Sequence, residues 1–126
     1  MANVLIIDDD KGMCFTLSAI VRQQGHDVTC AYTLEDGLKE AASIDYDLVL
    51  LDVQLSDGNG LHVLPQIRAM PSQPEIIIIT GQGDPDGAEL AIKNGAWDYI
   101  EKPASIKDMT LPFIRALQYR DKKQSV

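Results

Sequence analysis

The sequence predicts an α/β domain with one parallel β-sheet covered by helices on both faces. Three runs of four aliphatic residues, at 4–7, 48–51 and 76–79, have the composition of strands that are buried on both sides. Each run ends in a polar side chain: Asp8, Asp52 and Thr80 respectively. Segments with helical spacing of apolar residues lie between the runs, which favours short crossover connections in a single sheet.

The remaining elements follow from spacing and capping signals. Residues 27–32 and 97–100 complete a set of five strands. Thr33 and Ser105 each stand three residues before an acid, and Asp84 precedes a proline, so all three are expected to cap helices. The five expected helices run over 11–24, 34–43, 60–69, 85–94 and 105–120. Pro112 is expected to bend the last of them, unless Thr110 caps a later start.

Composition bounds the class of protein. At 126 residues, with 45% hydrophobic and 24% charged residues, the chain suits one globular domain. We assign residues 1–121 to this domain and 122–126 to a tail or the start of a linker. The net charge of −8 argues against direct binding of nucleic acid. Cys14 and Cys30 are expected to be reduced, and the absence of a signal or membrane segment predicts a cytoplasmic location.

Five polar side chains are expected to meet at one edge of the sheet. They are Asp8, Asp9, Asp52, Thr80 and Lys102, all at carboxyl ends of strands, where ligands of open α/β sheets bind. Two carboxylates about 4 Å apart repel by roughly 4 kcal/mol at an effective dielectric near 20. A divalent cation such as Mg²⁺ relieves that repulsion, and Asp10 is an alternative ligand.

This set of side chains suits transfer of a phosphoryl group to a carboxylate. Asp52 ends the central strand alone, which makes it the candidate nucleophile for an aspartyl phosphate. Asp8 and Asp9 form the adjacent metal-holding pair. Lys102 supplies a positive charge for a phosphate oxygen, and the hydroxyl of Thr80 supplies a hydrogen bond for another.

Across nearly its whole length the chain resembles the receiver domain of two-component response regulators. The resemblance is carried by four motifs: residues 5–10 (LIIDDD), 47–61 (DLVLLDVQLSDGNGL), 79–81 (ITG) and 95–103 (GAWDYIEKP). It implies a flavodoxin-like (βα)5 fold with strand order 2-1-3-4-5. Phosphorylation of Asp52 by a sensor histidine kinase is the implied function, so the domain is a phosphoacceptor rather than an enzyme acting on separate substrates.

The resemblance also implies roles for individual residues. Mg²⁺ is expected on Asp9, Asp52 and the backbone carbonyl of Gln54, with Asp8 acting partly through water. Thr80 and Tyr99 match the family's switch pair, and the bond between Lys102 and Pro103 is expected to be cis. Gln54 and Gln82, each two residues beyond a site residue, are expected to tune the lifetime of the phosphate.

The sequences of these motifs most resemble those in receivers of σ54-dependent (NtrC-type) transcriptional regulators. This likeness implies an output domain after the receiver, and a homodimer formed on phosphorylation through the fourth helix, fifth strand and fifth helix. Three other readings have different signatures. A phosphohydrolase of the haloacid-dehalogenase kind needs an acid at position 54, where this chain has glutamine. A flavin-binding domain needs a phosphate-binding loop at the position of Asp8–Asp10, whose carboxylates would repel phosphate. A phosphate-independent docking module would lack one or more of the five site residues, all of which are present.

Overall fold

The fold is a three-layer α/β sandwich around a parallel five-stranded sheet. In the computed structural model, residues 1–81, 85–102 and 105–124 are described. The sheet strands are β1 (Asn3–Ile7), β2 (Asp27–Ala31), β3 (Leu48–Leu51), β6 (Glu75–Thr80) and β7 (Asp98–Glu101). The helices are α1 (Lys11–Gln23), α2 (Leu34–Ser43), α3 (Gly60–Arg68), α4 (Pro85–Lys93) and α5 (Ile106–Gln124).

The strand order is β2-β1-β3-β6-β7, with every pair parallel. Counted over these five strands alone, this is the order 2-1-3-4-5, so the expected flavodoxin-like topology is confirmed. A two-stranded antiparallel ribbon, β4 (Gln54–Leu55) with β5 (Gly58–Asn59), lies between β3 and α3. This ribbon was not predicted, because two-residue strands show no periodicity and the segment contains only a run of turn-forming residues.

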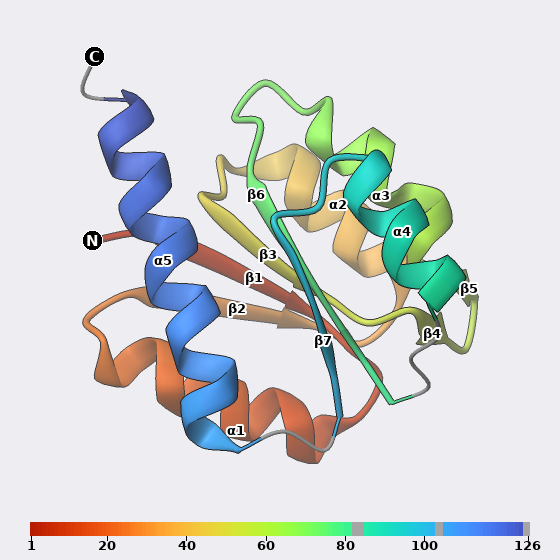
Figure 1. Ribbon diagram of the computed structural model, residues 1–126, viewed down its shortest axis with the longest axis horizontal. Coiled ribbons are helices and arrows are strands. Elements are labelled where there is room, and N and C mark those ends of the chain that lie inside the picture. The colour runs from red at the N-terminus through yellow and green to blue at the C-terminus, as the bar shows by residue number, and fades with distance from the viewer. Residues whose placement is uncertain (82–84, 103–104, 125–126) are drawn as a thin grey trace.

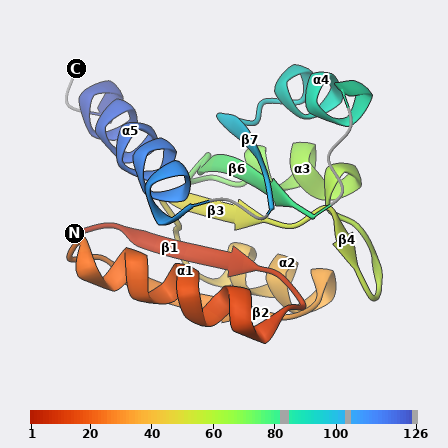
Figure 2. The same cartoon turned by 60° about the horizontal axis from the view of Figure 1, so that its bottom comes forward.

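Alternation along the buried strands divides the core into two layers. Ile7, Leu51 and Ile78 pack in one cluster with side chains from α2, α3 and α4. Ile6, Leu50 and Ile77 pack in the other, with side chains from α1 and α5. Figures 1 and 2 show the same arrangement, with α1 and α5 together on one side of the sheet. Aliphatic strands without polar positions are therefore explained by burial on both faces.

Several helix boundaries agree with the predicted caps. The Thr33 hydroxyl accepts a hydrogen bond from Asp36 N at 3.1 Å, and the Ser105 hydroxyl accepts one from Asp108 N at 3.0 Å. Thr110 does not cap a later start: it lies within α5, and its hydroxyl donates to the carbonyl of Ile106. The predicted cap at Asp84 lies outside the described residues.

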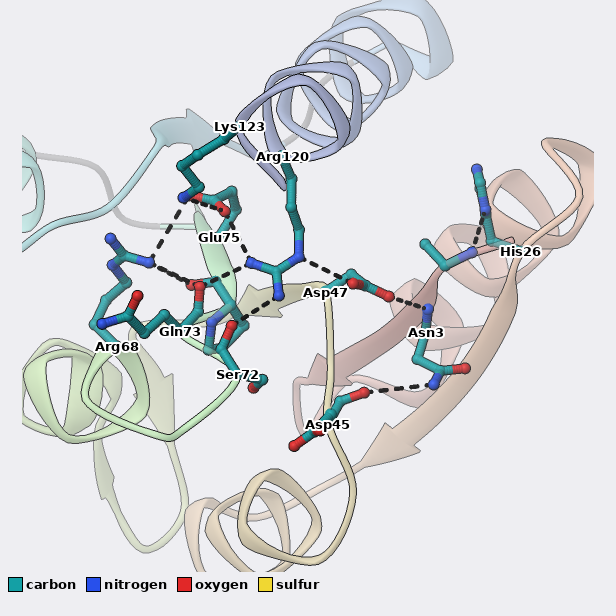
Figure 3. A network of polar contacts seen from close by, with 12 residues as sticks. Asn3, His26, Asp45, Asp47, Arg68, Ser72, Gln73, Glu75, Arg120 and Lys123 are labelled. Carbon is teal, nitrogen blue, oxygen red and sulfur yellow. Dashed lines mark hydrogen bonds and ion pairs between the residues drawn. The ribbon is translucent and has the colours of Figure 1, made fainter. Parts of the chain in front are cut away.

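Helix α5 runs to Gln124, so its predicted end at Arg120 is wrong. Arg120 is 5% exposed, and its acidic partners stand at the amino ends of β3 and β6, opposite the carboxyl edge of the predicted site. Its guanidinium donates to Asp47 Oδ1 at 2.9 Å and to Glu75 Oε2 at 3.1 Å (Figure 3). Lys123, also on α5, forms a further ion pair with Glu75 at 3.2 Å. These contacts hold the last turns of α5 against the sheet, which helical spacing alone does not reveal.

Within the described residues, none of the helices combines the length and apolar character needed to cross a membrane. The boundary between a domain at 1–121 and a tail at 122–126 stays a prediction.

Candidate phosphoacceptor site

An open cleft of about 520 Å³ lies at the carboxyl edge of the sheet. It forms where the ends of β1, β3, β6 and β7 converge, which is the position expected for ligands in this topology. The described residues that line it are Asp9, Asp10, Asp52, Gln54, Leu55, Ser56, Thr80, Gly81 and Lys102. The sequence predicts a role for all of these residues except Leu55, Ser56 and Gly81, with Asp10 expected only as an alternative ligand.

Asp8, Asp9 and Asp52 form an acidic cluster. Each offers one carboxylate oxygen such that the three atoms lie within 4.8 Å of one another. Asp8 and Asp52 are buried, at 2% and 7% exposure, whereas Asp9 is exposed to solvent. Three hard oxygen donors at this spacing can be bridged by one divalent cation.

Asp10 has a different task. Its side chain accepts a hydrogen bond from Met13 N at 3.1 Å and caps α1, while its own backbone N–H donates to Asp8 Oδ1 at 2.9 Å. The cap satisfies an otherwise orphaned helical N–H. Asp10 therefore orients Asp8 and starts the helix, and within the described residues it is not part of the acidic cluster.

Lys102 brings a positive charge between the two buried acids. Its Nζ lies 2.7 Å from Asp8 Oδ2 and 3.5 Å from Asp52 Oδ2. Burial works to lower the pKa of Lys102, but the hydrogen bond from its ammonium to Asp8 and the charges of both acids outweigh it and leave the pKa raised. Lys102 is thus held as a cation in the cleft. Its backbone N–H also donates to the carbonyl of Thr80 at 2.6 Å.

Ionisation of the Asp52 carboxyl group is unfavourable at this position. Desolvation, followed by the charge of Asp8, raises its pKa to about 6, although Lys102 and a hydrogen bond from Val53 N at 2.8 Å act in the opposite direction. One ammonium group does not fully compensate two buried carboxylates. The donor set therefore fits an additional cation, which would favour the charged form of Asp52.

The backbone after Asp52 turns sharply into α3. Gly60 N donates to the carbonyl of Val53 at 2.7 Å, and a Cβ on Gly60 would collide with the backbone carbonyl oxygen of Asp52. Only glycine allows the first turn of α3 to lie this close to the strand end. This contact places the β4–β5 ribbon, with Gln54, beside the phosphoacceptor candidate.

Thr80 and Tyr99 occupy adjacent strands. Thr80 is the last residue of β6 and lines the cleft, at 1% exposure. The register pairs Thr80 with Glu101 and Ile78 with Tyr99, so Tyr99 stands two residues behind the strand end and packs, partly buried, against the core. The structure thus brings Asp8, Asp9, Asp52, Thr80, Lys102 and Gln54 together, and sets Tyr99 back from the cleft. Gln82 and Pro103 lie outside the described residues.

One contact near the site was not anticipated. The carboxylate of Asp57, at the tip of the β4–β5 ribbon, accepts hydrogen bonds from Leu34 N and Glu35 N at the start of α2. The sequence placed Asp57 only within a turn-forming segment. Its partners lie more than twenty positions earlier in the chain, so local pattern carries no signal for this contact.

Comparisons with known proteins agree with this geometry. The family model for the response regulator receiver domain matches residues 4–112. Response regulator ArlR of Staphylococcus saprophyticus is 35% identical over 126 residues, covering 100% of this chain and 56% of that protein. The chain therefore spans little more than half the length of this curated relative.

Solved structures are similar over the whole chain. A CheY-like receiver domain protein from Methanospirillum hungatei matches with a TM-score of 0.92 and 25% identity, covering 98% of each chain. A response regulator protein from Burkholderia pseudomallei, solved with a phosphorylated aspartic acid, a calcium ion and citrate, matches with a TM-score of 0.83 and 26% identity. That match covers 99% of this chain and 72% of the other.

The chain belongs to the response regulator receiver domain family. It is a receiver domain of two-component signalling, which is a signalling module rather than a conventional enzyme.

Proposed function

We propose that this receiver accepts a phosphoryl group on Asp52, with Mg²⁺, from a sensor histidine kinase. The observation that carries the proposal is the position of Lys102, whose ammonium contacts Asp8 at 2.7 Å and faces Asp52 at 3.5 Å in a cleft lined by acids. In the reaction, an Asp52 carboxylate oxygen bonds to phosphorus as the bond from phosphorus to the donor nitrogen breaks. The phosphorylated aspartate in the similar Burkholderia structure supports the same chemistry here.

Asp8, Asp9, Asp52 and the backbone carbonyl of Gln54 would hold the metal. Mg²⁺ supplies positive charge to the phosphoryl oxygens in such transfers. Lys102 is already desolvated and positively charged, so it can bind a phosphoryl oxygen once the acids are occupied by the cation. The Thr80 hydroxyl, at the end of β6, is suited to donate to a second oxygen.

The switch and the phosphate lifetime are further parts of the proposal. Thr80 moving to the phosphate and Tyr99 turning inward would carry the signal to the surface of α4, β7 and α5. Gln54 lines the cleft beside Asp52. Together with Gln82 it is proposed to flank the entry of attacking water and so set the rate of phosphate loss.

The whole protein is proposed to be longer than this domain. Relatives such as ArlR extend well beyond the matched region, which supports an output domain on the full chain. A role in transcription regulation and a cytoplasmic location are further parts of this proposal. The amino-acid sequences of the receiver motifs favour an NtrC-type regulator. A homodimer formed on phosphorylation is part of the same proposal, with no nucleic acid or membrane bound by the receiver itself.

The test is the intact mass after incubation with acetyl phosphate or phosphoramidate. We expect one labile phosphoryl group that requires Mg²⁺ and is absent from Asp52→Ala, because among the described residues Asp52 is the carboxylate that both lines the cleft and pairs with Lys102. The decay of the same adduct in Gln54→Ala and Gln82→Ala measures the lifetime. An unmodified wild-type protein, under conditions that label another receiver, would contradict the proposal and favour a phosphate-independent docking module.

A further inference from the structure

The β4–β5 ribbon forms one wall of the cleft. Gln54, Leu55 and Ser56 all line the cleft, and only Val53 separates this segment from Asp52. The ribbon itself is short, with two residue pairs, Gln54 with Asn59 and Leu55 with Gly58. A two-stranded ribbon is only marginally stable by itself, so contacts outside it must hold this wall in place.

One end of the ribbon is fixed at the start of α3. Gly60 N donates to the carbonyl of Val53 at 2.7 Å, and the Asn59 side chain accepts from Leu61 N at 2.8 Å. These contacts secure the base of the ribbon and leave the tip, at residues 56 and 57, to be held by something else.

The tip is fixed by Asp57. One carboxylate oxygen accepts from Leu34 N at 2.9 Å and the other accepts from Glu35 N at 3.0 Å. These backbone N–H groups are the first two of α2, and Thr33 satisfies the third through Asp36 N. The two donors and the positive end of the helix lower the pKa of Asp57 below its ordinary value, so the carboxylate remains charged.

Packing beside Asp57 supports the same attachment. Gly58 has a φ of 153°, and a Cβ there would lie 3.0 Å from Leu34 Cδ1. Leu34 and Leu55 are both buried in the cluster beneath. The tip of the ribbon is therefore docked onto the first turn of α2 by two hydrogen bonds and by close contact.

We propose that Asp57 is a positioning residue for the phosphoacceptor site, holding the Gln54–Ser56 wall at a fixed place relative to Asp52. The inference rests on the proposed function of that site. Asp57 does not touch the reacting atoms. It acts through the ribbon, as groups outside the metal ligands do when they orient those ligands.

The experiment measures Mg²⁺ affinity by calorimetry on the unphosphorylated protein, together with amide hydrogen exchange over residues 53–59. We expect Asp57→Ala to bind Mg²⁺ about tenfold more weakly, the lower range for losing such a support, and to exchange faster throughout 53–59. Asp57→Asn retains an acceptor for only one of the two N–H groups, so we expect an intermediate affinity.

Thr33→Ala is the matched control. It removes a cap from the same helix, at Asp36 N, without touching the ribbon. We expect it to speed exchange at the start of α2 and to leave Mg²⁺ affinity at the wild-type value. Wild-type affinity in Asp57→Ala, or an equal loss in Thr33→Ala, would overturn the inference.

The two proposals fail differently. If acetyl phosphate does not label wild-type Asp52, the proposed function is wrong. If the wild type is labelled and Asp57→Ala binds Mg²⁺ as tightly as the wild type, only the role given to Asp57 is wrong.

Discussion

Lys102 and Asp8 are 94 positions apart in the chain, yet their side chains form the shortest ion pair of the cleft at 2.7 Å. The residues of this site were predictable because parallel strands deliver their carboxyl ends to one edge, so polar residues after apolar runs must converge there. The sequence did not indicate that Asp10, expected only as an alternative metal ligand, caps a helix. Asp10 caps α1 because it is the residue at which the chain turns from loop to helix.

Cys14 provides a test at the scale of a single residue. It is 1% exposed, its thiol donates to the carbonyl of Asp8 at 3.3 Å, and burial raises its pKa to about 12 from an ordinary 9.0. The thiol stays protonated in the folded protein where the unfolded chain has already ionised. Its contribution to stability is therefore complete below pH 9 and decreases as the pH rises toward 12.

We expect the stability difference between wild type and Cys14→Ala to shrink steadily between pH 9 and about 12. Urea unfolding at several pH values measures it, and the comparison cancels the titration of lysines and tyrosines common to both proteins. A difference that stays constant across this range would show that the Cys14 thiol ionises equally well in both states.

At the scale of elements, α5 shows which features of a helix can be predicted from the local sequence and which cannot. Pro112 lies inside the helix without ending it, because the helix is held by buried side chains on one face, among them Met109, Phe113 and Ala116. The extension to Gln124 depends on Arg120 and Lys123 finding acids on β6 and before β3. Such partners lie 45 or more positions away, and helical periodicity contains no information about them.

Arg120→Met tests the importance of that contact. The change removes donors to Asp47, Glu75 and the carbonyls of Ser72 and Gln73, and it leaves buried Glu75 with fewer cations. Loss of one partner from a buried ion pair costs about 3 kcal/mol. We expect a decrease of that size in the free energy of unfolding, measured with urea.

Lys39→Met is the control for this test. Lys39 pairs with Glu35 across one turn of α2, with both side chains more than 70% exposed. Exposed pairs of this kind contribute about 0.5 kcal/mol or less. If the two variants lose equal stability, the buried network does not fasten α5.

For the whole molecule, the fold was predictable because several independent features of the sequence favour the same arrangement. Strand composition, caps and polar strand ends each favour one parallel sheet. Among the described residues, the main departures from what was expected are the β4–β5 ribbon and the last turn of α5. The acids placed at the carboxyl edge also work against stability, since Asp8 and Asp52 share a cleft with a single lysine.

Mg²⁺ should therefore stabilise the entire domain. A concentration ten times the dissociation constant adds about 1.4 kcal/mol by mass action, which raises the melting temperature of a domain of this size by about 5 °C. Differential scanning calorimetry with Mg²⁺ and with EDTA measures the shift. Asp9→Ala should reduce it, and an unchanged melting temperature in wild type would count against a metal at this site.

The contacts of Arg120 also attach α5 to the sheet near its C-terminal end, so any tilt of the helix would occur about that point. The helix begins four residues after Lys102, and near its other end Arg120 and Lys123 attach it to Glu75 of the sheet (Figure 3). Nineteen residues make a rod about 28 Å long. The distance along the helix from Arg120 to Ile106 is about 21 Å, so a tilt of about 5° around Arg120 would displace the first residue of α5 by about 1.8 Å. We therefore expect any tilt of α5 to displace its first turns, which lie nearest Lys102 in the chain, more than its last turns.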